Sequence, residues 1–96
     1  MFDIVAGPEG QGHLRLVGRF DAAQADRARA AFGAVQGSIT ADCSELDYIS
    51  SLGIGILLET HKRLQDKGQA FRLVNVHPKV RTILTYAGLD KVLTLG

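Results

Sequence analysis

Hydrophobic and polar residues alternate at the start of the chain, which predicts a pair of strands. Phe2, Ile4 and Val5 open a short strand-like segment, and Leu14 and Leu16 alternate with polar neighbours in the stretch HLRLVGRF. The stretch GPEGQG between these segments is dense in residues that form turns. Because an alternation with a period of two is typical of a half-buried strand, residues 2–20 are predicted to form a β-hairpin.

Two later segments have apolar residues at helical spacing. The first covers about residues 22–35, and Asp21 and Gln24 stand before it as in a variant capping box. The second covers about residues 52–67, is apolar all round at its start and becomes polar from Glu59 onward. The first turns of this second helix are therefore predicted to be buried, and its end is predicted to lie in solvent.

A third helix is predicted to begin at Pro78, where a missing backbone N–H costs little. Its expected inner face consists of Val80, Ile83, Leu84 and Ala87. Gly88 has the position of a left-handed cap at the end of this helix, and Leu89 would make the hydrophobic contact that accompanies such a cap.

Strands are predicted between and after these helices, at residues 38–43, 69–76 and 91–95, with a loop at residues 44–48. Helices that alternate with strands favour an α/β layer with a mainly parallel sheet. We therefore expect residues 1–96 to form a single α/β domain. Its four- to five-stranded mixed sheet would carry all three helices on one face, and the strand order stays open at this point.

Composition and charge exclude several functional classes. The chain is 46% hydrophobic and 22% charged, as in globular proteins, and its formal net charge is +1 without a basic run. Such a charge gives no electrostatic reason to expect nucleic acid as a partner. The longest apolar stretch, residues 49–58, is about half as long as a membrane span. Since the first residues do not resemble a signal peptide, we expect a cytoplasmic protein without membrane insertion.

Candidate chemistry is sparse in this sequence. Cys43 is the single cysteine and is expected to be a buried small hydrophobe, and His13, His61 and His77 do not have metal-ligand spacing. No metal and no cofactor are therefore expected. An enzyme with a serine nucleophile and a histidine base is an alternative, but the sequence has neither a G-x-S-x-G elbow nor a phosphate-binding loop. We do not expect an enzyme.

Two serines stand where the second helix should begin, in the stretch YISSLGIGILL. A serine at this place can accept a hydrogen bond from a backbone N–H of the first helical turn, which explains one of the pair. From the pattern alone, the other is either structural or a hydroxyl presented for chemistry. Gly53 and Gly55 follow, although glycine is costly in a helix, so they are expected to leave room for the chain or a partner.

Three long segments resemble the STAS domain, the family of bacterial anti-sigma factor antagonists. They are GRFDAAQADRARAAF, ADCSELDYISSLGIGILL and FRLVNVHPKVRTILTYAGLDKVLTL, and together they span nearly the whole chain. The family's phosphorylation site usually reads Asp-Ser-Ser/Thr-Gly-Leu or Ser-Ser-Ala-Gly-Leu, and the hydroxyl after its first residue is modified. That position is Ser51. The sequence departs from the pattern at Ser50, where many members have Asp, and at Leu52, where Ser, Thr or Ala is usual.

The resemblance implies a partner-switching function in transcription. The chain would bind an anti-sigma factor with serine kinase activity, and phosphorylation of Ser51 would release it until a phosphatase restores the hydroxyl. Ser50, Leu52 and Gly53 would flank the site. Asp21 and Asp42 would be brought close to it, although Asp21 also suits a helix cap and Asp42 a strand end.

A second function stays open beside this one. STAS domains also resemble parts of anion transporters, signalling scaffolds and lipid-transport complexes, where they bind neighbours without a phosphorylation cycle. The departures at Ser50 and Leu52 are compatible with such a scaffold or carrier subunit. Self-association as a homodimer is not decided by the sequence.

Overall fold

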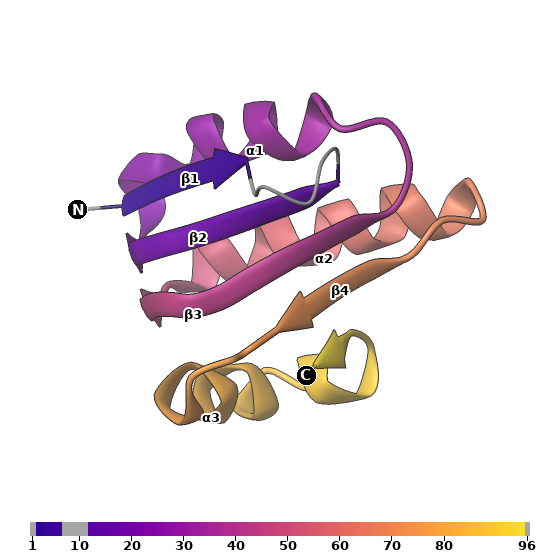
Figure 1. Cartoon of the computed structure of the whole chain (residues 1–96). Coiled ribbons are helices and arrows are strands. Elements are labelled where there is room, and N and C mark those ends of the chain that lie inside the picture. Colours follow the sequence, from indigo (N-terminus) through magenta and orange to yellow (C-terminus); the bar gives the residue numbers. More distant parts are fainter. Residues whose placement is uncertain (1, 7–11, 96) are drawn as a thin grey trace.

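The hairpin predicted at the amino end is the edge of a five-stranded mixed sheet in the computed structural model, which describes residues 2–6 and 12–95 (Figure 1). The strands lie in chain order, β1-β2-β3-β4-β5. Only the β1–β2 pair is antiparallel among them, and each later strand is parallel to the one before it. The strands are β1 (Phe2–Ala6), β2 (His13–Phe20), β3 (Ile39–Ile49), β4 (Phe71–Val74) and β5 (Thr94–Leu95).

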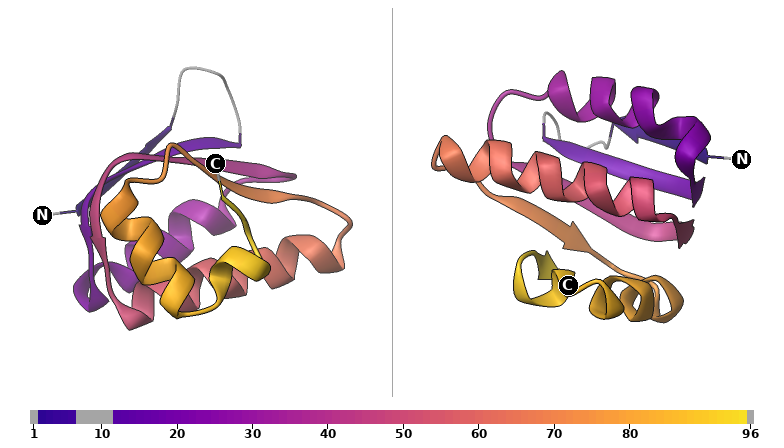
Figure 2. Two further views of the ribbon diagram at one scale, coloured as in Figure 1. Left: turned by 90° about the horizontal axis from the view of Figure 1, so that it is seen from below. Right: turned by 180° about the vertical axis from the view of Figure 1, so that it is seen from behind.

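The three α-helices lie on the same face of this sheet, as the left view of Figure 2 shows. They are α1 (Ala25–Gly33), α2 (Ser51–Asp66) and α3 (Pro78–Tyr86), and two short 3-10 helices accompany them, η1 (Ala22–Gln24) and η2 (Leu89–Lys91). The element order and the one-sided helical layer confirm the predicted fold class. No helix in the described part of the chain is both long enough and apolar enough to cross a membrane.

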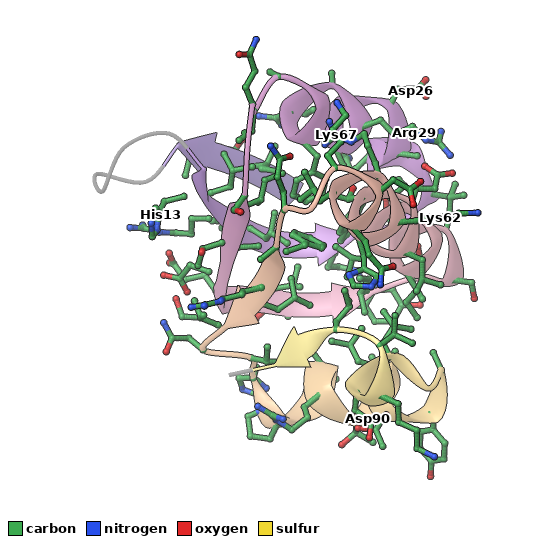
Figure 3. All side chains as sticks on the ribbon, turned by 90° about the vertical axis from the view of Figure 1, so that its right-hand side faces the viewer. His13, Asp26, Arg29, Lys62, Lys67 and Asp90 are labelled. Atoms are coloured by element: carbon green, nitrogen blue, oxygen red, sulfur yellow. The ribbon has the colours of Figure 1, made fainter. Side chains whose placement is uncertain are left out.

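The core fills the space between the sheet and the helices. Every second residue in the first halves of β2 and β3 is buried in it, and Phe32 of α1 meets Phe71 of β4 edge to face with ring centroids 5.7 Å apart. The opposite face of the sheet carries polar side chains, such as His13 in Figure 3, and the Arg19 guanidinium lies 4.3 Å from the centre of the Tyr48 ring. One face of the sheet is therefore buried and the other is polar.

The predicted loop at residues 44–48 was wrong, because β3 runs through it. Parallel pairing with β2 continues there, with Glu45 opposite Val17 and Leu46 opposite Gly18 after a register shift. Leu46 is only 1% exposed. Polar residues around Leu46 suggested a turn, but burial of this one side chain and pairing with β2 keep the segment extended.

The burial predicted for the start of α2 was also wrong in part. Leu52 and Leu58 are 42% and 37% exposed, because only one side of the helix faces the sheet. The inner face of α3 includes Val80 and Leu84, whereas Ala87 is exposed. The last predicted strand is shorter than expected, since η2 occupies part of it.

Candidate functional site

The candidate site lies where β2 and β3 end and α2 begins. Phe20 and Ile49 are paired at the ends of their strands, and the Ser50 N–H then donates to the carbonyl oxygen of Phe20 at 2.8 Å. Because Phe20 and Ile49 are almost completely buried, this junction is anchored in the core. The residues that follow are therefore presented from a rigid base.

Ser50 is the N-cap of α2, as predicted. Its backbone is extended, with φ −87° and ψ 171°, and its Oγ accepts a hydrogen bond from the Gly53 N–H at 3.2 Å. Its carbonyl oxygen accepts from the Ile54 N–H at 2.9 Å. Ser50 thereby satisfies one of the backbone donors that a helix start leaves without an internal partner.

Ser51 is the first residue of α2, and its side chain is exposed. The N–H groups of Ser51 and Leu52 belong to the first turn, so they have no partner inside the helix. The Ser50 Oγ accepts from the N–H of Gly53. Such N–H groups and the helix dipole favour negative charge at this end of the helix. Ser51 thus presents an exposed hydroxyl where an added anion would be tolerated.

The two glycines of the junction have different surroundings. Gly53 is buried, and a Cβ added there would meet Ile49 Cγ1 at 2.8 Å and the Phe20 carbonyl oxygen at 3.1 Å. A Cβ added at Gly55 would meet no described atom within 4 Å. Close packing of the chain therefore explains Gly53, as expected, whereas no internal contact requires Gly55.

Asp21 lies beside the site but its side chain is already engaged. It follows Phe20 directly, and its Oδ1 accepts a hydrogen bond from the Ala23 N–H at 3.2 Å as the cap of η1. The carboxylate is therefore held by its own turn at the end of β2. Asp21 is therefore a helix cap, and it also lies next to the junction.

Asp42 is not part of this cluster. It lies in the first half of β3 on the polar face, and at about 3.3 Å per residue it is roughly 20 Å from the end of the strand. Its Oδ1 accepts from the Ser44 N–H at 2.9 Å and from Asn75 Nδ2 at 3.4 Å. Desolvation raises its pKa, but these hydrogen bonds and Arg15 outweigh it and lower the pKa overall. Its placement near Ser51 assumed a strand that ends at Cys43, and β3 is longer.

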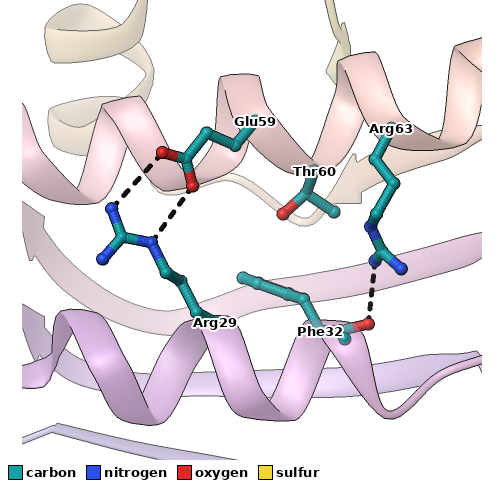
Figure 4. A pocket seen from close by; sticks show the side chains of 6 residues that line it. Arg29, Phe32, Glu59, Thr60 and Arg63 are labelled. Atoms are coloured by element: carbon teal, nitrogen blue, oxygen red, sulfur yellow. Dashed lines mark hydrogen bonds and ion pairs between the residues drawn. The ribbon is translucent and has the colours of Figure 1, made fainter.

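The contacts between α1 and α2 were not foreseen from the sequence. A pocket of about 220 Å³ lies between these helices. Arg29 Nε and Nη2 donate there to the two Glu59 oxygens at 3.1 and 3.3 Å, and Figure 4 marks these contacts with dashed lines. Arg63 Nη2 donates to the Phe32 carbonyl oxygen at 3.0 Å. The Arg29 hydrogen bond is the main reason that the pKa of Glu59 is lowered. No sequence motif connects residues so far apart, so only the fold could reveal these contacts.

Comparison with known proteins places the fold and the family. The chain is similar to an anti-sigma factor antagonist from Mycobacterium paratuberculosis, at 25% identity and TM-score 0.79, covering 99% of this chain and 83% of that one. It is similar to the unphosphorylated anti-sigma factor antagonist SpoIIAA, at 22% identity and TM-score 0.78, covering 100% and 88%. A sulfate transporter family protein from Wolinella succinogenes matches at 17% identity and TM-score 0.75, covering 93% and 75%.

Sequence comparison gives the family directly. No curated protein matches the chain in sequence. A family model described as "Mlab, STAS domain" matches residues 5–95 and so includes the β2–β3 junction, α2 and the capping serine. Among the described residues, no cluster of His, Cys, Asp or Glu could hold a metal ion. With the fold, the junction and a match over almost its full length, the chain belongs to the STAS domain family.

Proposed function

We propose that this chain is an anti-sigma factor antagonist whose binding to an anti-sigma factor kinase is switched by phosphorylation of Ser51. The observation that carries the proposal is the division of roles between the two serines. Ser50 is held by its hydrogen bond to the Gly53 N–H, whereas Ser51 is exposed on the same rigid junction. The similarity to two anti-sigma factor antagonists supports the choice of partner.

The chemistry of the proposed switch is phosphoryl transfer from ATP held by the kinase. The Ser51 Oγ attacks the γ-phosphorus, the bond to the β,γ-bridging oxygen breaks, ADP leaves and the hydroxyl proton passes to the kinase. This chain supplies the hydroxyl and has no catalytic role of its own. A phosphatase would hydrolyse the phosphoserine and restore the binding form, and the cycle would take place in the cytoplasm.

The phosphate is proposed to act on the complex and not on the fold. It adds about −1.5 to −2 charges at a helix end that favours anions, so α2 is expected to remain folded. In a contact with the kinase, the same charge would be buried without a partner, which is costly. The modified chain would therefore leave the kinase, and the kinase would become free to bind its sigma factor.

The proposal is tested by incubating the chain with a cognate anti-sigma factor kinase and ATP. We expect mass spectrometry to locate one phosphate on Ser51 and calorimetry to show weaker binding afterwards. Ser51→Ala should bind but resist modification, and Ser51→Asp should bind weakly. Ser44→Ala is a matched control because Ser44 is an exposed serine on β3, away from the junction. Phosphate on another residue, or unchanged binding after full modification of Ser51, would refute the switch.

A scaffold or carrier subunit is the second candidate function. The family model carries the description "Mlab", a sulfate transporter family protein has a similar fold, and Leu52 adds an exposed apolar side chain directly beside Ser51. A scaffold would bind its neighbour whether or not Ser51 carries a hydroxyl. If the wild type, Ser51→Ala and Ser51→Asp bind a transporter subunit with equal affinity, this function is favoured over the switch.

A further inference from the structure

Two exposed apolar side chains line one groove between α2 and η2. Leu58 and Val92 are 37% and 47% exposed, and both line a hollow of about 560 Å³. They come from segments that are distant in the sequence and adjacent in the fold (Figure 2). Exposed apolar residues are ordinary when they occur singly, but two that line one hollow mark a surface where an apolar group of a partner can bind.

The rim of this groove is mainly basic. Lys62 and Lys91 line it together with His61, against one carboxylate, Asp66. Neither lysine forms an ion pair within residues 2–6 and 12–95, and Figure 3 shows Lys62 at the surface of α2. The two ammonium groups are therefore available to carboxylates of another molecule.

The groove and Ser51 lie on the same side of α2. Ser51, Gly55, Leu58 and Lys62 are spaced by four, three and four residues, so they form one stripe along the outer side of α2. A Cβ at Gly55 would contact no described atom, and the stripe is flat there because the residue has no side chain. A partner that contacts Ser51 can thus extend along the same side of α2 to the groove.

We propose that the groove between α2 and η2 binds an acidic amphipathic helix of the protein that contacts Ser51. One apolar side chain of this helix would lie between Leu58 and Val92, and its carboxylates would face Lys62 and Lys91. The identity of this partner rests on the proposed function, but the chemistry of the groove does not. An acidic helix is chosen over a basic one because the charges that line the groove are mainly positive.

The test uses two synthetic helical peptides with the same leucine face, one rich in glutamate and one rich in lysine. Each is titrated into the ¹⁵N-labelled full chain. We expect the glutamate peptide to shift the amide resonances of Leu58, Lys62, Lys91 and Val92 and to bind about tenfold more tightly than the lysine peptide. Equal binding of both peptides, or shifts confined to other parts of the chain, would overturn the proposal.

Variants separate the apolar contact from the charge contact. Leu58→Asp should remove binding of the glutamate peptide, and the double variant Lys62→Glu/Lys91→Glu should reverse the preference between the peptides. Tyr86→Asp is the matched control, because Tyr86 is 90% exposed on α3 and lines a different pocket. A Tyr86→Asp variant that loses the peptide as Leu58→Asp does would also overturn the proposal.

The outcome is independent of phosphorylation, because neither peptide contains a kinase and binding is measured on the unmodified chain. Failure of Ser51 to be modified would remove the proposed function and leave the peptide result unchanged. If Ser51 is modified and the glutamate peptide does not bind, the groove inference alone is wrong.

Discussion

Replacing Gly53 with alanine tests whether the junction below Ser51 is as tightly packed as the structure shows. The new Cβ would lie 2.8 Å from Ile49 Cγ1, 3.1 Å from the Phe20 carbonyl oxygen and 3.2 Å from Phe20 Cδ1. None of these atoms can move easily, because Phe20 and Ile49 are at most 1% exposed and the Phe20 carbonyl accepts the Ser50 N–H. The methyl group must therefore displace the start of α2 or the end of β2.

Two opposing effects determine how far Gly53→Ala changes the free energy of unfolding. Alanine gains about 1 kcal/mol over glycine inside a helix, while overpacking in a filled core costs about 1–3 kcal/mol. Contacts this short favour the upper half of that range, so Gly53→Ala is expected to lower the free energy of unfolding by about 1–2 kcal/mol. For a domain of this size, that corresponds to a lower melting temperature by roughly 4–16 °C.

Gly55→Ala is the matched control, since it makes the same change two residues later in the same helix. A Cβ there meets no described atom within 4 Å, so only the higher helix propensity of alanine affects stability. This variant is expected to be more stable than the wild type by about 0.5–1 kcal/mol. Urea unfolding followed by circular dichroism measures both variants. If Gly53→Ala is as stable as the wild type, or if both changes shift stability in the same direction, the packing argument is wrong.

Three further predictions concern other groups of the fold. Ser50→Ala should lower the free energy of unfolding by about 1 kcal/mol in urea titrations, while Ser50→Asp, which keeps a capping oxygen, should lose much less. Burial raises the pKa of Cys43 to about 12, so its thiol should resist iodoacetamide at pH 8 in the folded chain and react once urea unfolds it, and rapid alkylation of folded protein would contradict this. The pKa of Asp42 is lowered in the folded state, so the ionised carboxylate stabilises the fold. This stabilisation is present above the unfolded pKa and is lost as pH falls through the folded pKa. Stability of Asp42→Asn should therefore fall less steeply on acidification than that of the wild type.

Local patterns predicted the elements because most of them are decided by neighbouring residues. The period of two in residues 13–20 and the glycine after α3, with φ 79° at Gly88, each correspond to an observed feature. The extension of β3 through residues 44–48 depends on pairing with β2, which is distant in the sequence, so no local signal could give it. The exposed Leu52 shows the same limit, because its burial depends on which side of α2 faces the sheet.

The site was predictable where it is built from consecutive residues. The cap at Ser50 and the close packing at Gly53 follow from the junction itself. The position of Asp42 depended on the length of β3, and the groove beside Val92 depends on how η2 lies against α2, so both required the fold. A sequence reading is therefore reliable for the local geometry of this site and unreliable for the surface around it.

A phosphate on Ser51, as proposed, should change the free energy of binding much more than the free energy of unfolding. At the exposed first position of α2 it gains about 0.3–1 kcal/mol from the helix dipole, which raises the melting temperature by roughly 1–8 °C. In an interface without a matching cation, the same charge costs several kcal/mol, and each 1.4 kcal/mol weakens binding about tenfold. The phosphorylated chain should thus melt no earlier than the unmodified chain while its affinity for the kinase falls by about a hundredfold or more. A melting temperature lowered by about 10 °C or more would show instead that the phosphate disrupts α2, and the switch would then work by unfolding.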